Sequence, residues 1–548
     1  MLYWLDTDGL AETLTNSQNL GMLGFLCFAF LAYEFLSMER SCRLEESVCH
    51  YKRQAWFRWF QVLDLLILAA LLTSVIFGYC VFACITQGAE LSLLVPYLLK
   101  CSLLNLFFVM TIGLLLGVLL ARLCTRYAAY GIIFLITALV AFLGEFLAAA
   151  VSAVSSSQID AYPLFDLFSI CAPDLNWITD AVYGVPMEGY RWDKAIFWLS
   201  VLGIDCVCLL SAKQGKRTGK RIICVICSAM ALCSLWNYGQ SGNDSYLLKD
   251  DSYAARTSRT FDADWYYYHY SEDAVIREEE AAFQVESYEL DFSVRRRLKA
   301  TATLILSGSP ENGTYSFTLY HGYVVTGVTD QAGNDLPYTR AGDYLEVTCA
   351  PVDGMVISYE GTGGKYYSNS QGIALPGYFA YYPMAGCLAL WESSSGSMKV
   401  NTDFETKEFT VTVDSDLNVV SNLNETGEHT FSGTAQTVTL IGGLVEEREL
   451  NGVSYLCQVM GESPYYGAPS SFRTLVSLLE EYRQEPMNSY QVFCLPVTLL
   501  QANANEEAAV IYFDDHILTD TYDETVLNQG LQEWIDSHPD QTEEAEHD

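Results

Sequence analysis

Residues 59–85, WFQVLDLLILAALLTSVIFGYCVFACI, set the class of this protein, because this run is apolar apart from one charged residue, Asp64. At 1.5 Å of rise per helical residue, about 20 apolar residues span the ~30 Å hydrocarbon layer of a bilayer. Five further apolar runs flank it within residues 1–238, at 20–36, 101–120, 130–154, 195–212 and 222–238. The sequence therefore predicts a polytopic α-helical membrane domain of six spans over residues 1–240.

The basic residues between these runs predict the orientation of the spans. Lys and Arg gather in alternate loops, which the positive-inside rule places in the cytoplasm. These residues are Arg40, Arg43, Lys52, Arg53 and Arg58; Arg122 and Arg126; and Lys213, Lys216, Arg217, Lys220 and Arg221. We expect both termini on the outer side. The first 19 residues are acidic and lack the basic start of a cleavable signal peptide, so the first span is expected to act as the signal.

The outer part of the chain is strongly acidic. Residues 1–237 hold 15 Lys and Arg and 17 Asp and Glu, so −34 of the net charge of −36 lies in residues 238–548. This charge keeps an outer domain soluble and excludes nucleic acid, whose phosphates attract Lys and Arg. Thirteen of the 17 cysteines lie in residues 1–237, where a thiol packs like a small apolar side chain, and the other four show no spacing typical of a disulfide scaffold.

Beyond residue 283 the apolar pattern changes to a period of two. Tyr288, Leu290 and Phe292 alternate with polar residues, as do Phe409 and Val411, and turns are predicted at SPENGT, QAGND and TGEHT. This predicts a linker at 241–282, whose stretch DADWYYYHY is a candidate docking segment, and an extracytoplasmic all-β, antiparallel domain at 283–445. Residues 446–548 are expected to form a small α/β segment with a disordered acidic tail, comprising a helix in PSSFRTLVSLLEEYRQEP, strands near 490–495 and 508–513 and a helix near 524–535.

The cytoplasmic segment 37–58 predicts an amphipathic helix. Leu44, Val48, Tyr51, Ala55 and Trp59 are spaced by four, three, four and four residues, as on one helix face. Such a helix would lie along the membrane surface or dock on a cytoplasmic partner. The stretch YEFLSMERSCRLEESVCHYKRQAWFRWFQVLDLL resembles the coupling region of type-2 ABC exporter permeases, whose intracellular helix sits on a separate ATPase subunit. The resemblance implies that this contact is made by Glu39, Arg40, Glu45 and Glu46.

The outer loop 155–194 resembles the outer re-entrant segment of the same family. By this resemblance the first span here matches the family's second, Met1 is a truncated or internal start, and the sixth span is an addition. A membrane core of two such subunits implies a dimer or heterodimer. EGTGGKYY and QGKRTGKR lack the Ser or Thr of a nucleotide-binding P-loop, so ATP hydrolysis is expected from another polypeptide.

The predicted β domain resembles the N-terminal β-saddle domain of the aminopeptidase N family of zinc metallopeptidases. The resemblance rests on ESYELDFSVRRRLKATATLIL, YYPMAG, FTVTV, VVSNL, HTFSG and VTLIGG, in that order. Catalysis in that family needs H-E-x-x-H on a helix and a further Glu ligand. No two of the seven histidines stand four residues apart and G-x-M-E-N is missing, so we expect no peptidase activity, catalytic residue, metal or cofactor.

Three further groups of residues resemble metal or redox sites only weakly, and a purely structural role stays open for each. Asp414, Asp416, Asn418 and Glu425 take positions 1, 3, 5 and 12 of a calcium loop, but a Val stands where its sharp turn requires Gly. Cys224 and Cys227 form a C-x-x-C that favours plain packing in a span. A surface turn, rather than a metal site, is predicted for Asp514, Asp515, His516 and Asp520.

Two carboxylates lie inside predicted spans, Glu145 and Asp205. A carboxylate there costs roughly 2.5–3.5 kcal/mol on insertion scales, so it must face the bundle or a wet cavity. A substrate path, a subunit contact and structural pairing are all consistent with these positions.

These observations favour the membrane-spanning permease subunit of an ABC-type exporter in a bacterial plasma membrane. Its partners are expected to be a separate ATPase, membrane lipid and a second permease subunit, and its noncatalytic ectodomain would bind or gate a substrate. Two alternatives stay open: a membrane-anchored extracytoplasmic binding or assembly protein, and the remnant of a membrane-tethered metallopeptidase.

Overall fold

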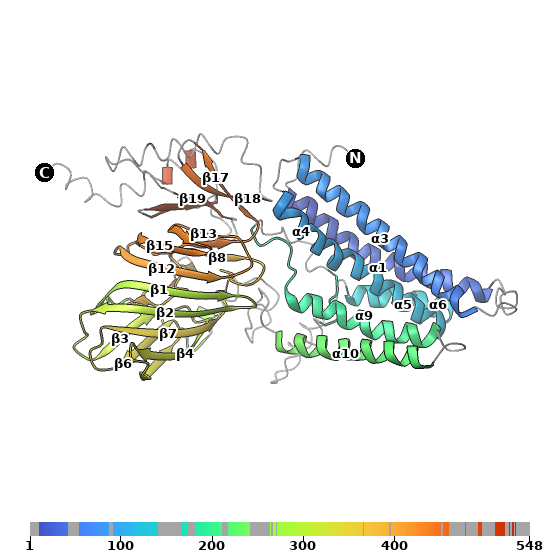
Figure 1. The fold of residues 1–548 in the computed structure, drawn as a ribbon, viewed down its shortest axis with the longest axis horizontal. Coiled ribbons are helices and arrows are strands. Elements are labelled where there is room, and N and C mark those ends of the chain that lie inside the picture. Colours follow the sequence, from blue (N-terminus) through green and yellow to red (C-terminus); the bar gives the residue numbers. More distant parts are fainter. Residues whose placement is uncertain are drawn as a thin grey trace. The chain divides into compact units, whose positions relative to one another are not determined.

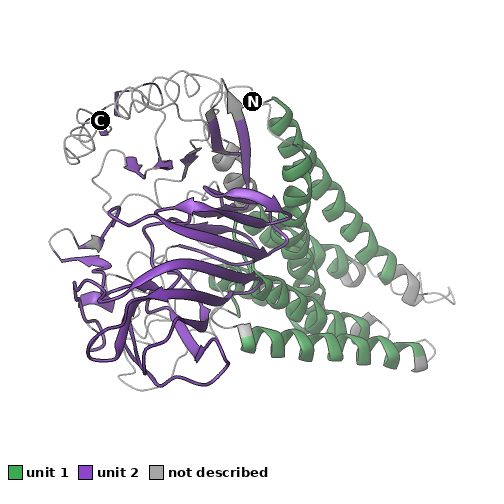
Figure 2. Ribbon diagram, turned by 60° about the vertical axis from the view of Figure 1, so that its left-hand side comes forward, with its two compact units in different colours: residues 1–179, 185–245 green, residues 180–184, 246–548 purple. Residues whose placement is uncertain are grey.

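The computed structural model describes a defined part of the chain. The described residues are 10–41, 54–86, 91–140, 167–171, 182–210, 217–241, 264, 267–269, 271–364, 366–393, 396–450, 453–459, 477, 491–495, 510–513, 515–520, 525–526, 529–530 and 532. They fall into two compact units, drawn in different colours in Figure 2. Unit 1 holds residues 1–179 and 185–245, and unit 2 holds residues 180–184 and 246–548.

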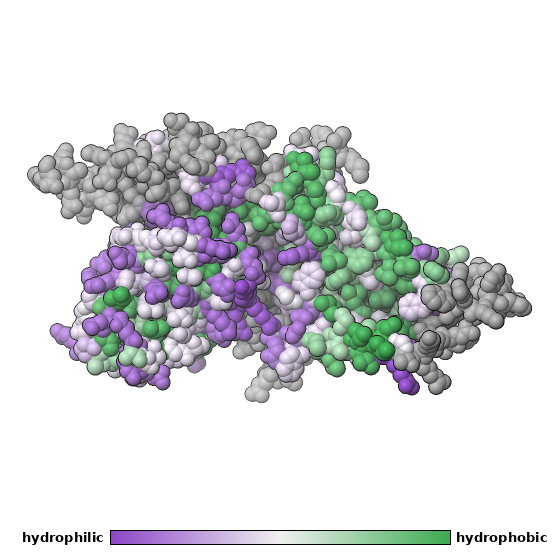
Figure 3. Space-filling model, in the orientation of Figure 1, coloured by the Kyte–Doolittle hydropathy of each residue, from purple (hydrophilic) through white to green (hydrophobic). Residues whose placement is uncertain are grey.

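Unit 1 is helical. Its described elements are α1 (Leu10–Ser41), α3 (Gln54–Thr86), α4 (Leu91–Ser102), the π-helix η2 (Leu103–Phe108), α5 (Val109–Leu123), α6 (Arg126–Ala138), α9 (Gly189–Leu210) and α10 (Arg217–Ser241). Four stretches of these helices are long and apolar enough to cross a membrane: Leu20–Met38, Trp59–Thr86, Leu91–Leu123 and Gly219–Gln240. Figure 3 shows apolar side chains gathered on the surface of this unit, as a lipid-facing surface requires.

The prediction of six spans is not matched by the described helices. The predicted fourth span begins in α6, a shorter apolar helix, and continues into residues 141–154, which lie outside the described residues. The predicted fifth span is helix α9. It carries Arg191, Asp193, Lys194 and Asp205, which is too many charged residues for it to count among these four apolar stretches.

The continuous helix formed by α4, η2 and α5 is the centre of unit 1. Pro96 lies inside α4, and six residues of π-helix separate α4 from α5. Most of α5 is buried, and its close neighbour is α1. A Cβ added at Gly113 or Gly117 would lie 2.4 Å from Phe25 O or 2.3 Å from Ala29 O, so glycine at these positions permits the close approach of the two helices.

Unit 2 is built from β-sheets (Figure 1). The largest has seven strands in the order β14 (Asn424–Gly427), β15 (Thr430–Ala435), β12 (Lys407–Asp414), β1 (Gln284–Val294), β2 (Leu298–Ser307), β7 (Gly354–Gly361) and β4 (Tyr323–Asp330). Smaller sheets are formed by β5 (Tyr338–Ala341), β6 (Tyr344–Thr348), β3 (Thr314–Thr318) and β9 (Met384–Ala385); by β13 (Val419–Ser421), β16 (Leu440–Gly442) and β8 (Ile373–Leu375); and by β10 (Trp391–Glu392) and β11 (Ser397–Met398).

The period of two in the sequence fixes which side chains enter the core of this unit. Along β1, Tyr288, Leu290 and Phe292 are buried while the residues between them face outward. The prediction of a purely antiparallel domain is wrong, because β1 pairs with β12 in parallel. The alternation of apolar and polar residues is the same for a strand read in either direction, so it carries no information on strand polarity.

A mixed five-stranded sheet follows, in the order β17 (Val445–Leu450), β18 (Val453–Gln458), β19 (Gln491–Cys494), β21 (His516–Thr519) and β20 (Val510–Tyr512). Two of its strands lie where the sequence predicts them, near 490–495 and 508–513. The two predicted helices of this segment fall largely outside the described residues, and so does the acidic tail.

Candidate functional site

One pocket of unit 2 has a volume of about 970 Å³, and we call it the acidic pocket. Three chain segments line it: residues 278–285, which lead into β1; residues 382–388, around β9; and residues 399–407, which lead into β12. The first and the last of these segments are more than 100 residues apart in the sequence. Pairing of β1 with β12 and of β3 with β9 brings them together.

The floor of the acidic pocket is apolar. Tyr288 and Phe409 stack on it with ring centroids 5.2 Å apart and planes inclined by 5°, on adjacent strands of the parallel pair. Tyr382 packs edge-on against both rings. Phe404 is half-buried and lines the pocket beside them. Tyr288, Phe409 and Tyr382 are only 2–3% exposed, so they form the packed base of the pocket, and Phe404 is the partly exposed ring among its described lining residues.

The rim of the acidic pocket carries an excess of negative charge. Five exposed carboxylates line it: Glu278, Glu279, Glu280, Asp403 and Glu405. Two lysines accompany them. Lys399 pairs with Glu278 at 2.8 Å, and Lys407 donates to the backbone oxygen of Glu405 at 3.3 Å.

The Lys407 amine lies deeper than the carboxylates around it. Its side chain is only 16% exposed, and Glu405 Oε2 lies 4.0 Å from its Nζ. Burial lowers the pKa of Lys407, although the charge of Glu405 acts in the opposite direction. Each lysine thus contacts a glutamate of the rim. Because the carboxylates outnumber the lysines, the electrostatic potential at the mouth of the pocket is negative.

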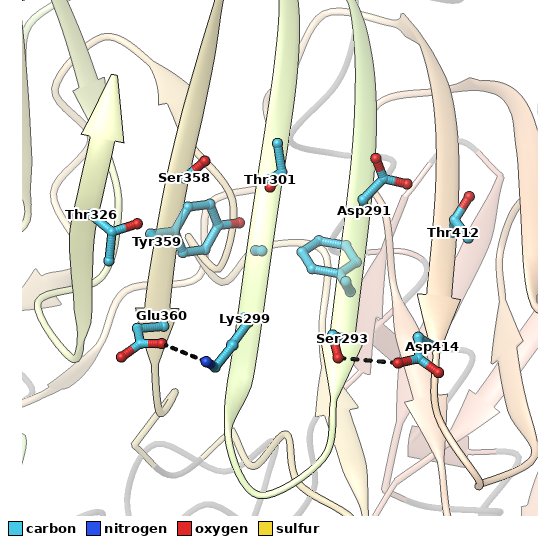
Figure 4. A pocket seen from close by; sticks show the side chains of 12 residues that line it. Asp291, Ser293, Lys299, Thr301, Thr326, Ser358, Tyr359, Glu360, Thr412 and Asp414 are labelled. Atoms are coloured by element: carbon cyan, nitrogen blue, oxygen red, sulfur yellow. Dashed lines mark hydrogen bonds and ion pairs between the residues drawn. The ribbon is translucent and has the colours of Figure 1, made fainter. Parts of the chain in front are cut away.

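A second hollow lies on the outward face of the seven-stranded sheet and is shown in Figure 4. Its side chains form cross-strand rows: Asp414, Ser293, Lys299 and Glu360 in one row, and Thr412, Asp291, Thr301, Ser358 and Thr326 in the next. Ser293 Oγ donates to Asp414 at 3.2 Å and Lys299 lies 3.3 Å from Glu360. Cross-strand pairs of this kind are usual on the polar face of a sheet, so we assign no ligand to this hollow.

The calcium-loop spacing that begins at Asp414 has a structural explanation. Arg295 pairs with Asp414 at 2.7 Å and with Asp416 at 2.6 Å, so both carboxylates already have a cationic partner. Asp414 ends β12 and Glu425 lies in β14, so the residues lie on strands rather than around one loop. Among the residues that the structure describes, no three His, Cys, Asp or Glu side chains gather as a metal site.

The residues around His516 form a buried network rather than the predicted surface turn. His516 is fully buried, with its Nδ1 2.9 Å from Asp515 Oδ1 and its Nε2 2.8 Å from Thr439 Oγ1. Thr, His and Asp in this order resemble a nucleophile triad, but Thr439 is also fully buried, so no substrate reaches it. The other two members of the predicted group are Asp514, outside the described residues, and Asp520.

The described residues of the stretch DADWYYYHY, a candidate docking segment, contact the β domain. Tyr320 donates to Asp264 at 2.5 Å, and Tyr268 donates to Asp343 at 2.7 Å, which also accepts from His321 N at 2.7 Å. Both carboxylates are 2% exposed. Burial, and then the charge of these carboxylates, raise the pKa of both tyrosines well above the ordinary value, which keeps them protonated as donors. The segment is thereby fixed to the β domain.

The predicted site residues of the membrane part are only partly described. Glu39 and Arg40 lie in the last turn of α1, which extends to Ser41, whereas Glu45, Glu46 and Glu145 lie outside the described residues. The helix α3 already begins at Gln54, so Ala55 and Trp59, assigned to the amphipathic helix, belong to α3. Asp205 is half-buried in α9. Among the described residues of this set, Glu39 and Arg40 thus share the end of α1, and Asp205 lies in α9.

Sequence reasoning gave too little weight to Glu34. Tyr130 donates to its Oε1, and Arg126 Nε lies 3.2 Å from the same oxygen, which joins α1 to the start of α6. Arg126 also donates to Tyr130 at 3.0 Å. The available signal was one acidic residue ending a span and one basic residue starting another, both at the predicted cytoplasmic edge.

No protein-family model and no curated protein matches this sequence. Solved structures show a distant resemblance over about 45% of the chain to zinc metallopeptidases of the M1 type. The M1 zinc metallopeptidase from Deinococcus radiodurans is 14% identical, with a TM-score of 0.34 over 45% of this chain and 63% of that one. Yeast LTA4 hydrolase in complex with bestatin is 11% identical, with a TM-score of 0.31 over 43% and 40% of the two chains.

An aminopeptidase N family protein from Idiomarina loihiensis is 9% identical, with a TM-score of 0.28 over 42% of each chain. The chain thus spans less than two thirds of the length of each of these structures.

Proposed function

We propose that this chain is the membrane subunit of an ABC-type exporter, powered by a separate ATPase, and that its β-rich unit meets the substrate outside. The observation that carries the proposal is the enclosed helix α4–η2–α5. Anchoring an outer domain needs no more than one helix that faces lipid on every side. Here Leu114, Val118 and Leu120 of the central helix are buried by neighbouring helices instead.

The interruption of this helix supports a transport role further. The π-helix η2 and Pro96 both disturb the regular hydrogen bonding of the backbone, and such irregularities in membrane helices are tolerated where other protein surrounds them. π-Turns are frequent at functional sites because they displace the helix that follows. A bundle with a buried, irregular helix is suited to a change of conformation driven by a partner.

The proposal is tested by the partner that it requires. We expect the tagged full chain, purified from its native membranes, to carry an ATPase with a Walker A motif and ATP hydrolysis activity. Replacing Glu45 and Glu46 by Lys should abolish co-purification, because charge reversal would disrupt the proposed coupling segment, while the chain still inserts in the membrane.

The matched control is a double reversal outside the proposed interface, Glu311→Lys with Glu428→Lys, two exposed positions of unit 2. This control should retain the ATPase. Absence of any ATPase from the wild-type preparation, or equal loss in both variants, contradicts the proposal.

The acidic pocket favours a second candidate function, a membrane-anchored binding protein that acts without an ATPase. Its volume of about 970 Å³ lies within the ~300–1,000 Å³ of common ligand sites, and charged side chains line its rim. The same co-purification experiment distinguishes the two functions, because a chain that binds a ligand but carries no ATPase is expected only of the second.

A further inference from the structure

Two cysteine side chains of unit 1 lie close together on neighbouring helices. Cys208 stands in the last turn of α9 and Cys224 in the second turn of α10, and their Sγ atoms are 3.9 Å apart. The helices α9 and α10 themselves pack side by side (Figure 1). The two thiols therefore face each other across the contact between these helices.

A second contact joins the same two helix ends. Lys220, in the first turn of α10, donates from Nζ to the backbone oxygen of Cys208 at 3.2 Å. A basic side chain is favourable at the C-terminus of a helix, because the last carbonyl groups have no partner within the helix. The side chain of Lys220 thus caps the end of α9 and holds the turn that carries Cys208 next to α10.

The exposure of the thiols differs between the two helices. Cys208 is exposed, Cys224 and Cys227 are half-buried, and Cys206 is buried. A small oxidant therefore reaches Cys208 first and finds Cys224 as its neighbour, which is the arrangement of an attacking and a resolving cysteine. The basic sequence after α9 predicts that this end of the helix pair is cytoplasmic. Disulfides of that compartment are transient and redox-sensing rather than permanent.

We propose that Cys208 and Cys224 form a reversible disulfide on exposure to a peroxide, which makes this pair a redox-controlled cross-link between α9 and α10. A disulfide bond is about 2 Å long, so the two sulfur atoms must approach each other by roughly 2 Å. That movement is divided between two small side chains.

Hydrogen peroxide is the oxidant in this reaction. The thiolate of Cys208 attacks one peroxide oxygen, the O–O bond breaks, and hydroxide leaves, which gives a sulfenic acid. The sulfur of Cys224 then attacks the sulfenic sulfur, and the S–O bond breaks as the S–S bond forms. The hydroxide and the sulfenic hydroxyl group take up the two thiol protons. Two thiols are thus oxidised by two electrons, and the peroxide is reduced to two molecules of water.

The cross-link restrains α10 more than α9. Helix α9 already packs on the central helix α5, whereas most of the large apolar side chains of α10 are exposed, as on a lipid-facing helix. A bond to α9 ties α10, the helix that precedes the β-rich unit in the chain, to the enclosed bundle. The inference is independent of the proposed function, because the bond forms with or without an ATPase partner.

The test detects the bond in the full chain, purified in nanodiscs and treated with hydrogen peroxide. N-ethylmaleimide then blocks the remaining thiols, and trypsin cleaves between the two cysteines, which are separated by Lys213, Lys216 and Arg217. We expect mass spectrometry to find peptides 195–213 and 222–249 joined through Cys208 and Cys224, and dithiothreitol to separate them. Oxidation should also slow amide hydrogen exchange in α10 severalfold, because the helix is then tied to α9.

Two matched variants, Cys224→Ser and Cys227→Ser, change thiols that lie three residues apart on α10. The first should lose both the joined peptides and the slowed exchange, and the second should keep both. An equal mixture of unlabelled and heavy-isotope-labelled chains identifies bonds between two copies, since these alone join a light peptide to a heavy one.

Three outcomes overturn the inference: no joined peptides in the oxidised wild type, joined peptides in equal yield from Cys224→Ser, and light-to-heavy pairs in place of bonds within one chain. Equal hydrogen exchange of α10 in the oxidised and the reduced wild type overturns the claim that the bond restrains this helix. A chain that forms the bond and carries no ATPase keeps the cross-link and loses the transport role.

Discussion

His516 is a buried histidine with a polar partner on each ring nitrogen. Asp515 Oδ1 lies 2.9 Å from Nδ1 and Thr439 Oγ1 lies 2.8 Å from Nε2, while Asp515 Oδ2 accepts from Asn422 Nδ2 at 2.5 Å. The network joins β21 of the five-stranded sheet to β16 of the three-stranded sheet. Buried polar groups that satisfy one another fix a unique arrangement, because losing one partner leaves the others unpaired.

The network predicts an acid-dependent loss of stability. Burial raises the pKa of Asp515, but the charge of His516 and hydrogen bonds from His516 and Asn422 outweigh it, so the pKa lies below its ordinary value. The ionised carboxylate therefore stabilises the fold above the unfolded-state pKa of about 3.9, and this stabilisation is lost as the pH falls through the lower folded-state pKa.

We expect Asp515→Asn to destabilise the protein by about 1.5 kcal/mol at neutral pH, since it removes a charge-assisted hydrogen bond. The difference from the wild type should shrink as the pH is lowered below about 3.9. Thermal unfolding of the full chain in detergent measures both effects. Asp353→Asn, at an exposed position, is the control. A difference that stays constant with pH would show that the charge of Asp515 is not involved.

At the scale of elements, the contact between α1 and α5 depends on glycine. Gly113 and Gly117 are four residues apart on α5, and an added Cβ at either would lie too close to a backbone oxygen of α1. Without a hydrophobic driving force between helices in lipid, close packing of this kind contributes much of the association.

We expect Gly113→Ala and Gly117→Ala each to destabilise unit 1 by about 1–3 kcal/mol, because α1 must move to accept the methyl group. The same change at Gly78 and Gly131, where nothing lies within 4 Å of an added Cβ, should be neutral or stabilising, since Ala is the better helix former. Far-UV circular dichroism during thermal unfolding in detergent distinguishes the two pairs. Equal effects at all four positions would exclude a packing role for the glycines.

The elements that the sequence predicts well are those whose signal is local. The run 59–85 is long and apolar, and it forms α3; the alternation at Tyr288 and Leu290 forms β1. The parallel pairing of β1 with β12 depends on chain direction, which alternation does not encode. The acidic pocket escaped prediction for a similar reason, because its aromatic and charged residues come from segments that only strand pairing brings together.

At the scale of the whole molecule, the segment Val182–Gly184 constrains the path through the membrane. Val182 and Tyr183 are buried in the core of the β-rich unit, Leu444 N donates to Val182 O at 2.9 Å, and Gln371 donates to Tyr183 O at 2.9 Å. Residues buried in one core lie on one side of a membrane. An even number of crossings must therefore separate residue 184 from the β-rich unit.

The even number of crossings after residue 184 constrains helix α9. The helix α10 is long and apolar enough to cross a membrane, and it lies between residue 184 and the β-rich unit. If α10 crosses, α9 must cross as well, in spite of Arg191, Lys194 and Asp205. Its charged first turns then lie at the outer surface, where Lys and Arg side chains extend toward water.

The number of crossings before residue 182 likewise determines on which side of the membrane the N-terminus lies. If the β-rich unit lies outside, as the positive-inside rule predicts, an outer N-terminus requires four crossings before residue 182. The helices α1, α3 and Leu91–Leu123 are long and apolar enough for three of them. The fourth must begin in α6, as the apolar run 130–154 predicts.

Single cysteines in a background without accessible thiols test this path. We expect a cysteine at Ser17, before the first span, and one at Ser309, on the exposed turn after β2, to react with an impermeant maleimide in whole cells. A cysteine at Ser211, between α9 and α10, should react only after lysis, because the basic loop around it is predicted to be cytoplasmic. Reaction at Ser309 without reaction at Ser17 would leave an odd number of crossings and remove the fourth span. Reaction at Ser211 in whole cells would instead remove α9 and α10 from the membrane together, since the core position of Val182 requires them to cross as a pair or not at all.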